Sequence, residues 1–356
     1  MSIIVRRATD ADIKDINKLY TLITSRERTI EEYCWQWQSS PAGKGLQWVI
    51  VDESQDEIIG HHGLMPFYFT YNGEQLIAAK TENTMVNPEY RSKMIYPIIE
   101  SKLLSSYKKK FDFIFSTKGP DPAIRLRHGL GYDLTHEWIR TDIVLSYKFY
   151  TSRIFSRHLI NQDIAEKSRK MNIIHMGEDV KDLSIFIEHT WSKVQKLSLL
   201  TPRRKWEDVK WRFFDNPYFN GYFSGYFITY NSSNVKGYAV IKKISYGVFQ
   251  VEDLIIYPFS INSYLYFFKK LILFIKSLDD VHMLILQMTD DTKFYSDVTK
   301  SVKVSILNTP LFIINFFIKN KHIKKRFMPR ILGKKSIKEK SSLHGWYITP
   351  FIFEGR

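Results

Sequence analysis

Cysteine is nearly missing from this chain, and so is any apolar run long enough to cross a membrane. One cysteine, Cys34, in 356 residues excludes a disulfide framework and a thiolate metal cluster, so we expect no metal site and a reducing, cytoplasmic setting. The longest apolar runs, 264–275 and 305–318, are interrupted by polar residues and fall short of the ~20 residues that a span needs. The first residues, 1–6, read as a strand and not as a secretory signal, because no small-residue cleavage site follows a helical apolar core.

Acidic residues are also in short supply. The chain has 37 Asp and Glu against 52 Lys and Arg, which gives a net charge of +15 and a pI near 9.5. Such a balance favours anionic partners. Ten of the cations lie in Lys319–Lys340. Two interpretations of this basic segment stay open, a solvated surface stretch and a patch that makes peripheral contact with an anionic membrane.

The length and an apolar content of 44% predict two domains, each with its own core. An internal repeat supports this division, because one sequence motif occurs twice with the same spacing at every matched position. The two copies are Arg28-x-x-Glu31-Glu32-x-x-Trp35-Gln36-Trp37-x-x-x-Pro41 and Arg204-x-x-Glu207-Asp208-x-x-Trp211-Arg212-Phe213-x-x-x-Pro217. We therefore expect domains at 1–145 and 171–356, the second including the basic segment, joined by a helical connector at 146–170.

The stretch 86–96 lies between an alternating strand pattern and a helix predicted over 98–107. A strand that turns sharply into a helix leaves backbone N–H groups without partners at the positive end of the helix dipole, which suits phosphate. The second copy leads from its strand at 251–257 through Pro258 into 259–264 and has no such stretch. We therefore expect the phosphate site in the first half only.

This stretch resembles the acyl-CoA-binding segment of the GNAT superfamily of N-acetyltransferases, Val-x-Pro-x-Tyr-Arg-Gly-x-Gly-x-Gly/Ala. The matching positions are Val86, Pro88, Tyr90, Arg91 and Lys93, whereas Ser92, Met94 and Tyr96 replace the glycines. A second stretch resembles the family's next motif, with Ala123, Leu126, Gly131 and Tyr132 in register and Arg127 where the family often has a tyrosine. The resemblance implies an α/β (α+β) fold of two tandem GNAT-like domains, each a mixed, mostly antiparallel sheet flanked by helices.

The resemblance also implies an acyl-CoA co-substrate and direct attack of an amine on its thioester, without a catalytic nucleophile. The residues that would bind acyl-CoA are Met85, Val86, Arg91, Ser92, Lys93, Met94, Ile95 and Tyr96. Met85 and Val86 would offer backbone to the thioester carbonyl, and the others would surround the phosphates.

Four side chains are candidates for proton transfer. Alternation along the strand 78–86 predicts that Lys80, Glu82, Thr84 and Val86 share a face, and Glu82 is the first choice for general base, with a salt bridge to Lys80 or Arg91 as the alternative. His61 and His62 titrate near neutral pH, but alternation lets at most one of them face the cleft. His128 is the remaining candidate, as acid for the departing thiolate.

For the acceptor, the chain resembles bacterial nucleotide-sugar N-acyltransferases of surface-polysaccharide pathways, which acylate a nucleotide-linked amino sugar. The 54 aromatic residues suit stacking on a base or sugar, and they equally suit a buried core. One alternative is a peptidoglycan-type aminoacyltransferase that uses aminoacyl-tRNA. Another is a non-catalytic GNAT protein that binds CoA or a polyanion. We do not expect nucleic acid as a partner.

Overall fold

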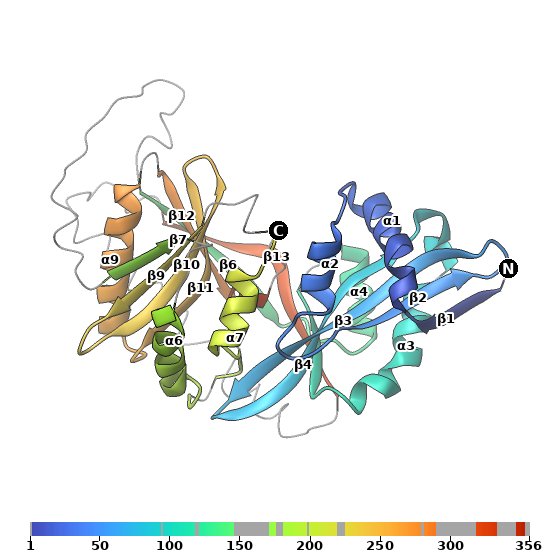
Figure 1. The fold of residues 1–356 in the computed structure, drawn as a ribbon, viewed down its shortest axis with the longest axis horizontal. Coiled ribbons are helices and arrows are strands. Elements are labelled where there is room, and N and C mark those ends of the chain that lie inside the picture. Colours follow the sequence, from blue (N-terminus) through green and yellow to red (C-terminus); the bar gives the residue numbers. More distant parts are fainter. Residues whose placement is uncertain are drawn as a thin grey trace.

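The computed structural model describes residues 2–93, 95–117, 121–145, 171–175, 181–197, 199–218, 225–278, 281–289, 318–332 and 347–352. The predicted connector, 146–170, and Met94 lie outside them. Figure 1 shows two lobes, one coloured blue to cyan and the other green to orange, with a red strand between them.

The two lobes share one core order of elements, strand, helix, helix, three strands, helix and strand, and each lobe adds further elements to it. The first contains β1 (Ile3–Arg7), η1 (Asp10–Asp12), α1 (Ile13–Thr24), α2 (Ile30–Trp37), β2 (Leu46–Asp52), β3 (Glu57–Tyr71), β4 (Glu74–Val86), η2 (Pro88–Lys93), α3 (Ile95–Lys108), β5 (Phe113–Ser116), α4 (Asp121–Gly129) and β6 (His136–Val144). The second contains β7 (Met171–His175), α6 (Lys181–Val194), β8 (Thr201–Pro202), α7 (Trp206–Val209), η5 (Lys210–Phe214), β9 (Gly225–Asn231), β10 (Lys236–Ser245), β11 (Val248–Tyr257), α9 (Ile261–Ser277), β12 (Met283–Thr289), β13 (Ile318–Ile331) and η7 (Pro350–Ile352).

Local sequence sets the ends of these helices. In α2 the Thr29 side chain accepts from the backbone N–H of Glu32 while the Glu32 carboxylate accepts from that of Thr29, so two unpaired donors are satisfied. Helix α1 ends at Thr24, and the next residue, Ser25, adopts a left-handed conformation that stops it. Helix α3 begins at Ile95, three residues before the predicted start, because Pro97 falls in its first turn, where a proline costs no hydrogen bond.

The described strands form one continuous sheet in the order β1-β2-β3-β4-β5-β13-β6-β12-β11-β10-β9-β7, with β8 on the side of β3. All pairings are antiparallel except β4–β5 and β11–β12. The predicted mixed α/β fold, with a mostly antiparallel sheet flanked by helices, is confirmed.

The lobes exchange strands at the centre of this sheet. Strand β6, from the first half of the sequence, pairs with β12, and the long β13 pairs with β6 over Ile318–Phe327 and with β5 over Met328–Ile331. The expected boundary at residue 145 therefore follows a strand that lies among those of the second lobe. The basic segment is not simply a surface stretch, because its residues up to Ile331 belong to this central strand, while 333–340 lie outside the described residues.

The two copies of the repeated motif meet at the joint between the lobes. Trp35 of α2 and Trp211 of η5 stack with ring centroids 5.1 Å apart, and each indole N–H donates to the other residue's carbonyl, at 2.8 and 3.2 Å. Such reciprocity is what a local two-fold relation between repeats produces. The largest apolar cluster contains buried residues of both lobes, so the expectation of two separate cores was wrong.

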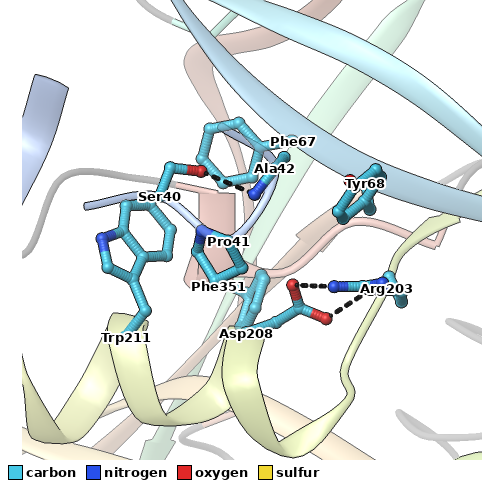
Figure 2. Close-up of a pocket in the computed structure, with 9 residues that line it drawn as sticks. All are labelled: Ser40, Pro41, Ala42, Phe67, Tyr68, Arg203, Asp208, Trp211 and Phe351. Carbon is cyan, nitrogen blue, oxygen red and sulfur yellow. Dashed lines mark hydrogen bonds and ion pairs between the residues drawn. The ribbon is translucent and has the colours of Figure 1, made fainter. Parts of the chain in front are cut away.

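A shallow pocket beside this joint has its polar groups already paired. In Figure 2, Arg203 and Asp208 face each other under Tyr68, and Pro41 lies above Trp211. The Arg203 guanidinium donates to both Asp208 oxygens, at 2.7 and 2.9 Å, and lies 4.1 Å from the Tyr68 ring centre. We interpret this pocket as part of the joint. Within the described residues, no helix is long and apolar enough to cross a membrane.

Candidate active site in the first lobe

A gap opens in the sheet where β4 leaves β5. The two strands pair only at Ala78–Lys80 with Phe113–Phe115. Strand β4 then continues to Val86, whereas β5 stops at Ser116. Residues 81–86 of β4 therefore have backbone without a strand partner on the β5 side, among the residues that the structure describes. Unpaired backbone groups at such an edge can bind an extended ligand.

A bulge in β4 lies inside this gap. Opposite β3, the register runs from His61 with Met85 to Gly63 with Glu82, so β4 has one extra residue here. Asn83 has φ of 46°, a left-handed conformation uncommon outside glycine. Bulges re-aim side chains and are frequent beside active sites.

The bulge makes the predicted alternation wrong beyond Glu82. The Thr84 hydroxyl lies 3.1 Å from His62 Nδ1, and Val86 packs with Ile95 and Ile99 of α3. Met85 instead contacts Leu19 and Tyr20 of α1. Glu82 and Thr84 therefore face opposite sides of the sheet, although strict alternation would place them together.

The second lobe has an equivalent gap, and the chain itself fills it. Strands β11 and β12 pair only at Val248–Gln250 with Met283–Ile285. Beyond that point, the Tyr347 hydroxyl donates to the Leu254 carbonyl of β11, and the Thr289 N–H of β12 donates to the Ile348 carbonyl at 3.2 Å. The segment 347–352 thus lies between the diverging strands. No described segment bridges the first gap in this way.

A buried ion pair in the second lobe anchors the segment 347–352 in its gap. Arg204 and Asp253, both fully buried, bind through several hydrogen bonds with a closest approach of 2.9 Å. The hydroxyl of Thr349, within that segment, donates a hydrogen bond to the Asp253 carboxylate at 2.7 Å. At the matching position of the repeat, Arg28 binds the neutral side chains of Asn17 and Gln36.

The predicted phosphate stretch forms η2 and the start of α3, directly after the gap. Arg91 is exposed, and its Nε donates to the Val86 carbonyl at 3.2 Å. Ile95 is buried against Ile50 and Ile59, as Met85 is against α1, so these two can offer a ligand only their backbone. The side chains of Ser92 and Lys93, like Met94, lie outside the described residues.

Glu82 lies beside Lys80, and the two form the salt bridge that the sequence offered as the alternative to a base. Lys80 is almost fully buried, whereas the Glu82 side chain keeps 16% of its exposure. Glu82 is therefore the more accessible member of the pair.

His61 is buried on the face of the sheet that packs against α2. Its Nδ1 lies 2.7 Å from the Asn83 carbonyl, and its Nε2 lies 3.1 Å from the Gln47 side-chain oxygen. Burial lowers the pKa of His61 to about 3, although the hydrogen bond to Asn83 opposes that shift. His61 is therefore neutral at pH 7, and its single N–H donates to one of these two oxygens.

His62 faces the opposite side, so the two histidines do lie on different faces as predicted. It belongs to a buried polar cluster under α3 and α4, which contains His62, Tyr96, Glu100, Arg127 and Tyr132. Glu100 accepts a 2.5 Å hydrogen bond from the Tyr132 hydroxyl, and its other oxygen lies 3.6 Å from His62 Nε2. Burial lowers the pKa of His62 and raises that of Tyr132.

His128 does not join this cluster. It is exposed on α4, while its neighbour Arg127 is buried and turns inward. Tyr96, which replaces a glycine of the motif, also points inward, with its ring centre 6.0 Å from that of His62. Sequence reasoning missed Glu100, and the available signal was a carboxylate four residues after Tyr96, on the same helix face.

Comparisons with known proteins agree with this geometry. Residues 4–120 match the family model described as an acetyltransferase (GNAT) domain. No curated protein matches the sequence.

Solved structures extend the likeness over most of the chain. A probable N-acyltransferase from Enterococcus faecalis is 17% identical with a TM-score of 0.61, over 96% of this chain and 75% of its own. A tandem GNAT protein from the clavulanic acid biosynthesis pathway is 9% identical with a TM-score of 0.53, over 94% and 100%. N-myristoyltransferase from Saccharomyces cerevisiae with bound myristoyl-CoA is 11% identical with a TM-score of 0.50, over 92% and 82%. At these identities the likeness shows the fold.

Residues 4–120 of the first lobe therefore match an acetyltransferase (GNAT) domain, and this match confirms the prediction of an acyltransferase at that level. The matched residues include β4, its bulge, the gap and the start of α3.

Proposed function

We propose that this protein transfers an acyl group from acyl-CoA to the amine of a nucleotide-linked amino sugar. The observation that carries the proposal is the difference between the two gaps. The gap after Lys80 is followed by an exposed arginine at a helix start, whereas the gap after Gln250 is filled by segment 347–352. One lobe can thus admit an extended thioester arm, and the other serves as scaffold.

The roles in the first lobe follow from the gap. The free backbone of β4 would bind the pantetheine arm and the thioester carbonyl, and the start of α3 with Arg91 would bind the diphosphate. Glu82, on the edge of the gap, would accept the proton of the attacking amine. The yeast neighbour, which holds myristoyl-CoA, supports the choice of co-substrate.

The choice of an amino-sugar acceptor follows from the resemblance carried by the repeated tryptophan motif. The net charge of +15 suits an anionic nucleotide carrier. Trp35 and Trp211 of that motif stack on each other in the joint between the lobes, so these two rings do not themselves contact an acceptor.

Thermal unfolding with candidate ligands tests the proposal. At a hundredfold excess over Kd, acyl-CoA should stabilise the protein by about 2.7 kcal/mol, which raises Tm by several degrees. Free CoA and dephospho-CoA serve as matched ligands, and UDP- and dTDP-amino sugars and tRNA complete the panel. Thiol release followed by mass spectrometry then identifies the acylated product. No stabilisation by any CoA ester refutes the proposal, and stabilisation by tRNA alone favours the aminoacyltransferase alternative.

A further inference from the structure

A pocket in the second lobe lies between helix α6, the turn that joins β9 to β10, and the end of β11. It holds about 370 Å³ of space, part of it open to solvent, which is near the lower end of the ~300–1,000 Å³ of small-molecule sites. Three basic side chains line it, His189 and Lys193 from α6 and Lys236 from β10. The described residues that line the pocket include no carboxylate, so its charge suits an anion.

The basic groups of this pocket converge without a counter-charge. Lys236 Nζ lies 3.2 Å from His189 Nε2, which accepts a hydrogen bond from the ammonium group. Lys193 follows His189 by four residues on α6, so the two side chains share one face of the helix. Among the described residues, neither lysine forms a salt bridge. Glu188, the carboxylate next to His189 in sequence, does not line the pocket and accepts from the backbone N–H of Trp206 at 2.8 Å.

The repeat shows that the scaffold does not require a basic turn at this place. The equivalent turn of the first lobe joins β2 to β3, and the stretch 52–57 contains four acidic residues. The stretch 231–236, between the equivalent strands of the second lobe, contains Lys236 and no acidic residue. Two lobes with the same core order thus carry opposite charge at one turn. This difference indicates that the basic turn serves a ligand and not the fold.

Neutral groups complete the lining. Ser233 and Asn234, in the turn between β9 and β10, place a hydroxyl and a side-chain amide at the pocket. Tyr257 lies directly opposite Lys236 in the pairing of β10 with β11, and it is partly exposed. The pocket therefore combines cations, neutral hydrogen-bond donors and one aromatic ring.

We propose that this pocket binds a phosphate monoester, independently of acyl-CoA. A phosphate monoester carries a charge of about −1.5 to −2 at pH 7, which the two lysines balance, whereas a phosphate diester carries a single negative charge. The Ser233 hydroxyl and the Asn234 amide would donate to phosphate oxygens. The Tyr257 ring would pack against the group that carries the phosphate.

Calorimetric titration at constant ionic strength tests the charge and the ring. Phenyl phosphate should bind more tightly than inorganic phosphate, because its ring can contact Tyr257. Methyl phenyl phosphate, the matched diester, should bind at least about tenfold more weakly than phenyl phosphate. A diester that binds as tightly as the monoester overturns the proposal, and so does a protein that binds neither phenyl phosphate nor inorganic phosphate.

Three variants test the place of binding. Lys193→Gln and Lys236→Gln should each weaken the binding of phenyl phosphate by about tenfold or more, because each removes a charge-assisted contact. Lys196→Gln is the matched control, since Lys196 is exposed three residues after Lys193 and does not line the pocket. Its affinity should stay within about threefold of that of the wild type. Both lysine substitutions lie outside the buried core, so these variants should fold.

Acyl-CoA separates this pocket from the proposed site of the first lobe. Phenyl phosphate should still bind when acyl-CoA is saturating, and the lysine variants should keep their affinity for acyl-CoA. Unchanged binding in both lysine variants, or complete displacement of phenyl phosphate by acyl-CoA, overturns the assignment to this pocket. A protein that binds phenyl phosphate but no acyl-CoA refutes only the proposed function.

Vesicles distinguish a soluble monoester from a lipid head group with the same chemistry. The expected ligand is soluble, so vesicles that contain phosphatidic acid should sediment the wild type and Lys236→Gln equally. A loss of sedimentation specific to Lys193→Gln and Lys236→Gln overturns the soluble source and places the monoester on a lipid.

Discussion

The burial of neutral His61 makes the stability of the folded protein depend on pH, and part of that stability is lost in acid. Because burial lowers the folded-state pKa of His61 to about 3, the folded protein keeps this ring neutral while the unfolded chain protonates it near pH 6.5. The stabilisation is complete above about pH 6.5 and is lost as pH falls toward 3. From pH 7 to pH 5 the loss is 1.5 pKa units, or about 2 kcal/mol.

Urea unfolding at pH 7, 6 and 5 measures this loss in the wild type and in His61→Gln. The variant starts from a lower stability, but the difference between the two proteins should shrink by about 2 kcal/mol over this range. His128→Gln, at an exposed position, is the control and should follow the wild type. A constant difference between wild type and His61→Gln would show that His61 titrates in the folded protein as it does in the unfolded chain, and His61 would return as a candidate for proton transfer.

The other predictions concern the gap and the joint. Glu82→Gln should lower kcat/KM by about 10²-fold with little change in acyl-CoA affinity, as steady-state kinetics and calorimetry would show. Arg91→Ala should chiefly raise KM for acyl-CoA, because a phosphate contact acts equally in the ground and transition states. Trp35→Ala and Trp211→Ala should each cost about 3–5 kcal/mol in urea unfolding, and the double variant should cost clearly less than their sum, because each change removes the same stacked pair.

Three outcomes would contradict these assignments. An unchanged pH–rate profile in Glu82→Gln removes that residue from the mechanism. Undiminished acyl-CoA affinity in Arg91→Ala places the diphosphate elsewhere. Additive costs for the two tryptophans would mean that they stabilise their own lobes separately.

The sequence predicted the strand, the turn and the helix around 86–107 and revealed the repeated motif, because those signals are local. Apolar alternation identifies a strand, Pro88 and Pro97 bound the helix start, and matched spacing reveals a duplication. The salt bridge between Glu82 and Lys80 was one of the alternatives that the strand pattern offered.

The bulge at Asn83 could not be predicted, because one inserted residue has no signature of its own in a strand of polar residues. Its consequence was large, since Thr84 moved to the face of His62. The cluster around Glu100 was missed for a related reason. A carboxylate in an amphipathic helix reads as solvent-facing, and only the contact with Tyr132, 32 residues away, shows that it is buried.

The pairing of β6 and β13 could not be predicted from local patterns either, because pairing between distant strands depends on the whole sheet.

This exchange of strands between the lobes also has a consequence for biosynthesis. The edge of β5, which borders the proposed thioester gap, is covered only when β13 has been translated, after every other described strand. Until then, the nascent first lobe displays an unpaired strand edge that invites aggregation. A fragment cut at residue 145 lacks β13 and would leave that edge exposed, so it is a poor substitute for a chain that includes β13.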